Sequence, residues 1–235
     1  MDTITHSAIG MCLGELIAGK QLGKKAMLYG IIANNIPDVD VTTSLWMNHA
    51  DALLAHRGFT HSILFTGLCT PLLALVAVKW SKKKTLSFNR WMLLFGSGLF
   101  LHIFIDAFTT YGTGWFEPFS HERISFNTLF IIDPLFSLPV LIAAILILVT
   151  KKNFPRRAMI AKAGIFAATI YIVLSISVKL YVDNQVKRSF AASQIPYSDF
   201  MATPRRSISY CGISSEKTIQ IITSAIILFS IKSFR

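Results

Sequence analysis

Long apolar runs separated by short basic segments dominate the chain from residue 62 onward. Three strong runs cover Ser62 to Val78, Trp91 to about Thr110, and Leu129 to Val149, and a fourth covers Ala158 to about Tyr181. As an α-helix, about 20 apolar residues cross a bilayer core of roughly 30 Å. We therefore predict an all-α, polytopic membrane protein in which these four runs are the strong transmembrane helices.

The beginning of the chain is less apolar. Ile4 to Ala18 and Ala26 to Asn35 are predicted helices separated by three lysines, and each is short for a complete span. Pro37 should end the second, since proline interrupts helices. No basic start with a small-residue cleavage site is present, so a removable signal peptide is not expected. We predict a helical membrane domain over residues 1–181 and a C-terminal tail over 182–235.

The composition agrees with a membrane location. Hydrophobic residues make up 53% of the 235-residue chain and charged residues only 15%, which is unusual for a soluble domain. The formal net charge of +11 would also suit a nucleic-acid-binding protein, but the basic residues gather between the apolar runs, as they do in cytoplasmic loops. We expect membrane lipids as partners and no nucleic acid. Cys12, Cys69 and Cys211 are scattered, so neither a disulfide framework nor a CxxC metal site is indicated.

The loop charges predict an orientation in the membrane. Loops 79–90 and 151–157 carry five and four basic residues and should be cytoplasmic. Loop 111–128 carries a single basic residue, Arg123, beside two glutamates, and should face outward. Alternation then places the N-terminus and the 37–57 segment outside.

Ionisable residues gather on the same outer side, although they were not used to derive the orientation. Asp106 lies 16 residues after Arg90, or about 24 Å along a helix, near the outer boundary. His102 precedes it by four residues and shares its helix face, and His61 opens the first strong run. Such groups are costly near lipid and need partners or a function.

These residue types suit a divalent cation. Imidazole nitrogen and carboxylate oxygen are the usual ligands of catalytic zinc, and manganese or iron also accepts such a mixture. Alone, His102 and Asp106 are explained equally well as a buried hydrogen-bonded pair. The wider cluster favours a divalent metal, with zinc as the first choice. The predicted metal ligands are His6, Asp38, Asp40, His56, His61, His102 and Asp106.

Four groups of residues resemble the motifs of a known family. They are Thr5-His6, Ile36-Pro37-Asp38-Val39-Asp40, His56-Arg57-Gly58-x-Thr60-His61-Ser62, and His102-x-x-x-Asp106-x-x-Thr109-x-Tyr111-Gly112. They look like those of the YdjM-like family of bacterial inner-membrane proteins, which are regarded as metal-dependent hydrolases. The resemblance covers roughly residues 1–135 and implies a multi-pass inner-membrane hydrolase. With the loop charges, its site should face the periplasm or exterior.

The order of these residues is also similar to that of zinc-dependent phospholipase C and P1-nuclease type enzymes, which use them around a polynuclear zinc site. This second resemblance implies one ion shared by four side chains: Asp38 or Asp40, His61 or His56, His102 and Asp106. It also implies that His6 and Asp106 approach another ion. We assign catalytic roles to Asp38, Arg57 and Asp106.

Several other polar residues have two explanations. Arg57 can clamp an anionic substrate group, or it can snorkel to lipid phosphates and lock its loop by pairing with an acid. Thr60 is expected to be a helix N-cap rather than a ligand. Asp133 can cap a helix, although we favour a contact with a histidine N–H beside the metal. His49 and His121 lie in loops without matching partners and should be surface histidines.

The tail departs from the pattern of the resembling family. There, a Met-Ala-Thr-Pro type segment usually leads into an aromatic-containing domain outside the membrane. Here Met201-Ala202-Thr203-Pro204 is followed by a serine-rich, basic sequence, and the apolar run Ile219 to Ile231 has only 13 residues, too short for a secure span. We therefore expect a shortened or atypical tail.

Two function classes fit the sequence. The first is a hydrolase whose metal lowers the pKa of bound water and polarises a phosphoester or a lipid-linked substrate. The second is a transport or ion-handling protein with a pathway of His and Asp residues. Such a pathway should reach the other face, yet Leu72 to Val78 and Val140 to Val149, in the inner halves of their spans, carry no ionisable residue. We expect the hydrolase; its substrate and the oligomeric state stay open.

Overall fold

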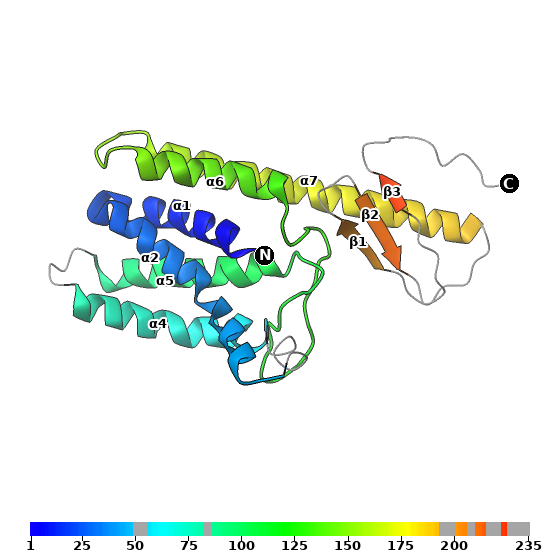
Figure 1. Cartoon of the computed structure of the whole chain (residues 1–235), viewed down its shortest axis with the longest axis horizontal. Helices are drawn as coiled ribbons and strands as arrows, with labels where there is room; N and C mark the ends of the chain where they lie inside the picture. The colour runs from blue at the N-terminus through cyan, green and yellow to red at the C-terminus, as the bar shows by residue number, and fades with distance from the viewer. Residues whose placement is uncertain (49–55, 82–85, 193–200, 206–209, 215–221, 225–235) are drawn as a thin grey trace.

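The computed structural model describes residues 1–48, 56–81, 86–192, 201–205, 210–214 and 222–224. Its described elements form a bundle of long helices followed by a short sheet (Figure 1). The α-helices are α1 (Thr3–Leu22), α2 (Lys24–Asn35), α4 (Ile63–Trp80), α5 (Phe88–Asp106), α6 (Pro134–Val149) and α7 (Arg157–Ala192). Two 3₁₀ helices, η1 (Pro37–Leu45) and η2 (Phe59–His61), join the first helices to α4.

The helical membrane fold predicted from the sequence is confirmed. In the described part of the chain, α4, α5 and α7 are long and apolar enough to cross a membrane, and α6 is a shorter apolar helix of 16 residues. Several boundaries differ from the prediction, and two of them lie near the ionisable residues. α5 ends at Asp106 rather than near Thr110, and α6 begins at Pro134 rather than Leu129 because Asp133 caps it, accepting a hydrogen bond from the Leu135 backbone N–H.

α1 and α2 pack against each other through small residues. A Cβ atom added to Gly10 or Gly30 would collide with the backbone carbonyl of the other, and one on Gly14 would collide with that of Ala26. Small residues let transmembrane helices approach closely and gain dispersion contacts. This contact fixes the less apolar N-terminal hairpin, although α2, with 12 residues, is too short to cross the bilayer alone.

The first helix of the hairpin lies inside the bundle. α1 contacts α2, α5, α6 and α7, so it is covered on several sides, whereas α4 packs mainly on α5. One face of α4 presents a row of exposed leucines spaced three or four residues apart: Leu64, Leu68, Leu72 and Leu75. That spacing is a single helix face, and its composition suits contact with lipid chains.

A buried ion pair joins α1 to the beginning of α7. The Arg157 guanidinium donates from Nε to Glu15 Oε1 at 2.9 Å and from Nη2 to Glu15 Oε2 at 2.7 Å. Its Nη1 donates to the carbonyl oxygens of Ile147 and Thr150 at the end of α6. Arg157 therefore ties three helices together at the end of the bundle where α6 turns into α7 (Figure 1).

The C-terminal region contains strands that the sequence did not predict. α7 continues past Tyr181 to Ala192, and β1 (Met201–Arg205), β2 (Tyr210–Ser214) and β3 (Ile222–Ser224) form an antiparallel sheet in that order. Pro204 lies in an edge strand, where its missing N–H is tolerated. Most of the apolar run 219–231 lies outside the described residues, and the division at residue 181 stays a prediction.

Candidate metal centre

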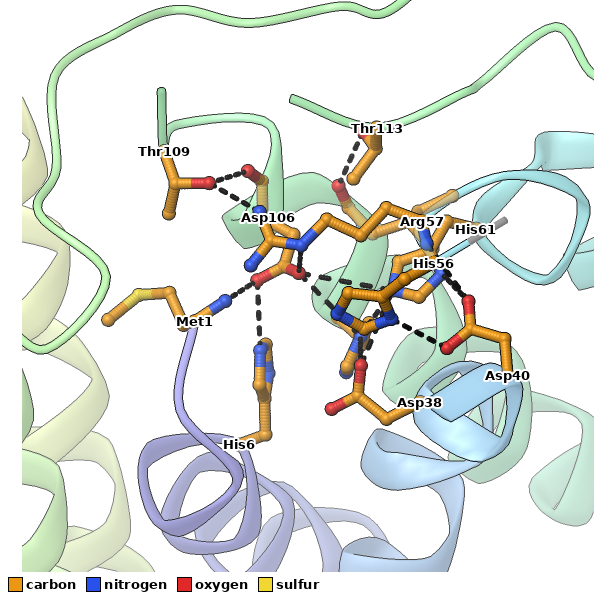
Figure 2. Close-up of polar contacts among 12 residues, drawn as sticks. Met1, His6, Asp38, Asp40, His56, Arg57, His61, Asp106, Thr109 and Thr113 are labelled. Carbon is orange, nitrogen blue, oxygen red and sulfur yellow. Dashed lines mark hydrogen bonds and ion pairs between the residues drawn. The ribbon is translucent and has the colours of Figure 1, made fainter. Parts of the chain in front are cut away.

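Four separate segments bring the predicted ligands together at one end of the bundle (Figure 2). His6 comes from the first turns of α1, Asp38 and Asp40 from η1, and His102 and Asp106 from neighbouring turns at the end of α5. His56 and His61 come from the segment that leads into α4. The only predicted ligands with an appreciably exposed side chain are Asp38 (18%) and His56 (28%).

Asp38, His61, His102 and Asp106 direct four potential ligand atoms toward one point, all within 4.8 Å of one another. His61 Nε2 lies 3.1 Å from His102 Nε2, and Asp38 Oδ1 lies 3.5 Å and 3.3 Å from these two nitrogens. Asp106 Oδ2 completes the group at 3.9 Å and 4.0 Å from them. Ligands about 2.0–2.1 Å from a tetrahedral zinc ion are separated by roughly 3.3 Å, so the spacing fits a small cation.

Hydrogen bonds orient both imidazoles for metal binding. His102 Nδ1 lies 2.7 Å from the Asn34 carbonyl oxygen, and His61 Nδ1 lies 3.1 Å from Thr60 Oγ1 and 3.2 Å from Asp40 Oδ2. The Asn34 and Asp40 oxygens are acceptors, and the Thr60 hydroxyl donates to Asp40, so a proton on each Nδ1 would leave each Nε2 lone pair directed at the centre. Metal-bound histidines in proteins are held in the same way.

This arrangement leaves acceptor atoms that the protein does not satisfy. Asp106 Oδ2 is buried and has no hydrogen-bond partner among the described residues. The two Nε2 atoms face each other and a carboxylate oxygen at close range. A proton or a cation between them resolves the electrostatic conflict. The His/Asp cluster therefore has the donor set and the unmet acceptors of a cation site.

The electrostatics keep the carboxylates of η1 ionised. Burial would raise the pKa of Asp38, but the adjacent imidazoles of His102 and His61 outweigh it and hold this pKa well below its usual range. Burial would also raise the pKa of Asp40. Hydrogen bonds with His56 and His61 outweigh burial there, so this pKa is lowered as well. Both groups are thus in the anionic form that binds metal.

Asp40 connects the segment before α4 to η1. Its Oδ1 lies 2.7 Å from His56 Nδ1, and its Oδ2 accepts from Thr60 Oγ1 at 2.6 Å and from the Arg57 backbone N–H at 3.0 Å. Asp38, Asp40 and His56 also form a second group whose ligand atoms are close enough to share an ion. The structure thus separates the alternatives left open by the sequence: Asp38 and His61 join the four-atom group, while Asp40 and His56 stand beside it.

His6 lies on the far side of Asp106. Its Nε2 is 3.0 Å from Asp106 Oδ1, and its ring stacks on that of His102 with centroids 3.9 Å apart. The α-amino group of Met1 is paired with the same oxygen, Asp106 Oδ1. His6 therefore positions Asp106 and His102, and its own Nδ1 is buried without a hydrogen-bond partner among the described residues.

Arg57 is turned into the protein rather than toward the membrane surface. Its Nη1 donates to Thr109 Oγ1 at 2.6 Å, its Nε lies 3.3 Å from Asp106 Oδ2, and its guanidinium lies over the Tyr111 ring. The backbone of Arg57 has φ = 66°, a conformation that residues other than glycine rarely adopt. Of the roles expected for Arg57, the geometry shows the pairing with an acid, which is Asp106. Strain of this kind often marks functional sites.

Three other expectations can be compared with the structure. The N-cap of α4 is Ser62, which accepts from the Phe65 backbone N–H, so the prediction for Thr60 was wrong. Asp133 accepts from Tyr171 Oη at 2.7 Å and caps α6. It contacts no histidine among the described residues, which contradicts the preferred role. His121 is a surface histidine, 86% exposed, as predicted, and His49 lies outside the described residues.

Sequence reasoning missed Asn34. Its carbonyl oxygen orients His102, and its side-chain Nδ2 donates to the His6 carbonyl oxygen at 2.6 Å. The only signal in the sequence is a pair of asparagines directly before the Ile-Pro-Asp segment. An asparagine near a helix end has many explanations, so that signal does not identify the role.

The site can now be compared with known proteins. The sequence matches the profile of the family described as YdjM inner membrane protein over residues 1–186. It is 32% identical over 122 residues to "Inner membrane protein YbcI" of Escherichia coli (strain K12), covering 51% of this chain and 69% of that protein. It is 31% identical over 144 residues to "Uncharacterized protein YfhP" of Bacillus subtilis (strain 168), covering 57% of this chain and 42% of that protein. No solved structure matches.

The match to the family includes every segment that contributes to the His/Asp cluster, and it extends beyond the residues that carried the resemblance in sequence. The three long apolar helices and the shorter α6 agree with the membrane location in the family's description. The chain therefore belongs to the YdjM inner membrane protein family.

Proposed function

We propose that this protein is a membrane-bound, metal-dependent hydrolase. The single observation that carries the proposal is the convergence of Asp38 Oδ1, His61 Nε2, His102 Nε2 and Asp106 Oδ2 on one point. Asp106 Oδ2 is buried there without a hydrogen-bond partner among the described residues. Catalytic zinc sites keep a coordination position for water and can expand to five ligands, and the partly exposed Asp38 marks the side from which water would reach this site.

Zinc is the cation that we propose, held by these four residues. When bound, a divalent ion of this kind supplies a water of lowered pKa and polarises the bond to be cleaved. Asp38 is the ligand nearest the open side, with 18% of its side chain exposed. We assign it the additional role of accepting a proton from an approaching water.

Arg57 and Asp106 complete the proposed catalytic group. Asp106 is a ligand through Oδ2, and its Oδ1 is held by His6. Arg57 places a permanent positive charge beside it, at 3.3 Å from Oδ2, and a guanidinium there can also contact an anionic oxygen of a substrate. A phosphoester or lipid-linked substrate would use both the metal and this charge. We propose that the site faces the periplasm or exterior, as the loop charges suggest.

A transport function finds less support. The buried charged groups described toward the other end of the bundle, Glu15 and Arg157, are paired with each other and with helix-end carbonyls. A pathway for ions needs groups that exchange partners along its length. The accessible members of the His/Asp cluster, Asp38 and His56, lie at one end of the bundle, so the described residues do not form such a pathway.

Metal analysis combined with hydrolysis assays tests the proposal. Purified protein should contain at least one zinc or similar ion per chain and should hydrolyse phosphodiester or phospholipid substrates until a chelator is added. His102→Ala should lose both properties while staying folded. His121→Ala, the same change at an exposed histidine away from the cluster, should lose neither.

Two results would reject the proposal. Wild-type protein that binds no metal after zinc is supplied would remove the site. Turnover that survives both the chelator and His102→Ala would show that any hydrolysis follows another mechanism.

A further inference from the structure

The burial of the His/Asp cluster restricts how a ligand can reach it. His6, His61 and His102 are fully buried, and Asp106 is 1% exposed. Asp38 and His56 are the members with accessible side chains. In the part of the chain that the structure describes, a ligand therefore reaches the centre past these two residues.

An open cavity of about 720 Å³ lies on this accessible side, next to the N-terminus and between α2 and η1. Its polar lining consists of Asp2, Thr3, Asn35, Asp38 and His56. Most of its surface is apolar and includes Ile32, Ile36, Val39 and Val41. Its volume is in the usual range for small-molecule sites, and the cavity adjoins the metal centre at Asp38, which belongs to both.

The cavity opens beside further exposed apolar side chains. Val39 and Val41 are more than half exposed, and Leu45 and Trp46, at the end of η1, are 80% and 67% exposed. In water these side chains would be unfavourable, whereas tryptophan and aliphatic groups are stable at the boundary between headgroups and hydrocarbon. The mouth of the cavity is thus placed at the membrane interface.

We infer that this cavity binds the hydrocarbon part of an anionic membrane amphiphile whose phosphate group reaches the metal centre. The inference rests on the proposed function, since it assigns the substrate class of the same site. The apolar wall complements a hydrocarbon chain, and the proposed ion with Arg57 behind it, 3.3 Å from Asp106 Oδ2, would attract an anionic head past the carboxylates of Asp2 and Asp38. A soluble nucleotide or sugar phosphate would leave Ile32, Val39 and Val41 without apolar contacts.

Photocrosslinking tests the inference without requiring turnover. Wild-type protein is reconstituted in phosphatidylethanolamine–phosphatidylglycerol vesicles that contain a phosphatidic acid with a diazirine near the start of one acyl chain. A parallel sample contains the diacylglycerol with the same chain but no phosphate. We expect the phosphate-bearing probe to label the peptide around residues 32–41 about tenfold more than the neutral probe, as one charge-assisted contact would give.

The exposed leucine face of α4 is an internal control, because bulk lipid contacts it whichever headgroup is present. Its labelling should be the same with both probes. Val41→Asp should reduce labelling around residues 32–41 by the phosphate-bearing probe and leave the metal content unchanged. Val41→Ser, a milder change, provides the same comparison if the aspartate variant fails to fold.

The outcomes separate this inference from the proposed hydrolase. Equal labelling of residues 32–41 by both probes would overturn the lipid subsite, even if a soluble phosphodiester is hydrolysed. Phosphate-dependent labelling without hydrolysis of any substrate would support the subsite and contradict the enzyme. If both are correct, Val41→Asp should slow turnover of long-chain phospholipid and retain turnover of a short, soluble phosphodiester.

Discussion

The Glu15–Arg157 pair and the His/Asp cluster both bury charge inside the same helical bundle. Arg157 begins α7 at the α6–α7 turn, whereas Asp106 ends α5, and Figure 1 shows that turn and the end of α5 at opposite ends of the bundle. At Glu15, two nitrogens of one guanidinium meet two carboxylate oxygens, and the third nitrogen, Nη1, reaches helix-end carbonyls. At the His/Asp cluster, two imidazole lone pairs and two carboxylate oxygens converge on a point that no described protein group occupies.

The difference distinguishes structural charge from functional charge. A buried ion pair with every polar atom matched resists change, because removal of one partner strands the other in an apolar environment. At the His/Asp cluster, the Arg57 guanidinium and the Met1 amino group reach Asp106 alone, and the acceptor atoms that face the centre are left for a cation to neutralise. Burial and ionisability are common to both groups; the match of donors to acceptors is what separates them.

Breaking the structural pair should have the largest effect. Glu15→Ala leaves the Arg157 guanidinium buried without its counterion, so we expect a loss of about 3–5 kcal/mol in the free energy of unfolding. Thermal unfolding of the detergent-solubilised protein measures this loss. The double variant Glu15→Leu with Arg157→Met should recover much of the stability, since no unpaired charge remains. A single variant as stable as the wild type would contradict the structural role.

Loosening the metal centre should have a smaller effect. Asp40→Asn weakens the hydrogen bond that orients His61, and changes to such supporting residues typically reduce metal affinity by about 10–100-fold. Zinc titration of the purified apoprotein measures the change. Asp183→Asn is the matched control, because Asp183 pairs with Lys179 at 3.1 Å on α7, away from the site. Equal zinc affinity in the two variants would show that Asp40 does not support the metal.

A still smaller effect is expected from Arg57→Lys. Lysine keeps the positive charge and has no greater difficulty with the positive φ, but it loses the planar guanidinium that can contact two groups together. Turnover of an anionic ester should fall about tenfold with metal content unchanged. Kinetics and metal analysis on the same preparation measure both quantities. Arg90→Lys, at an exposed arginine near the lysine-rich loop, is the control. Unchanged turnover in Arg57→Lys would remove Arg57 from the catalytic group.

The last prediction concerns which end of the helical bundle faces the cytoplasm. The cysteine substitutions that test it should leave stability unchanged. In a background without Cys12, Cys69 and Cys211, a cysteine at Asn48 should react with a membrane-impermeant thiol reagent in intact cells. One at Ser81 should react only after the membrane is opened, because the adjoining lysine-rich loop is predicted to be cytoplasmic. Labelling at position 81 alone would invert the orientation.

Periodic features could be predicted from the sequence. The long apolar runs defined α4, α5 and α7, since the length of a span follows from the thickness of the bilayer. His102 and Asp106 were placed together because residues four apart share a helix face. Charge inside a membrane protein also marked the remaining site residues, since such charge is expensive unless it is used.

Local geometry outside regular helices could not be predicted in the same way. Asp38 and Asp40 both lie in η1, and only its 3₁₀ path decides that Asp38 faces the imidazoles while Asp40 supports them from behind. The same applies to Thr60 and Ser62, because the cap is set by the residue at which α4 begins. Asp133 binds Tyr171 rather than a histidine because α6 and α7 pack side by side.

By itself, the sequence determined a helical membrane protein with its ionisable residues gathered at one end, because hydropathy and helical periodicity are properties of neighbouring residues. The tertiary structure decided which acceptors share a centre and which charges are paired. Glu15 and Arg157 are 142 residues apart, and the Asn34 carbonyl that orients His102 is 68 residues from it. Contacts of this kind depend on how whole helices pack, and no local pattern encodes which atoms that packing brings together.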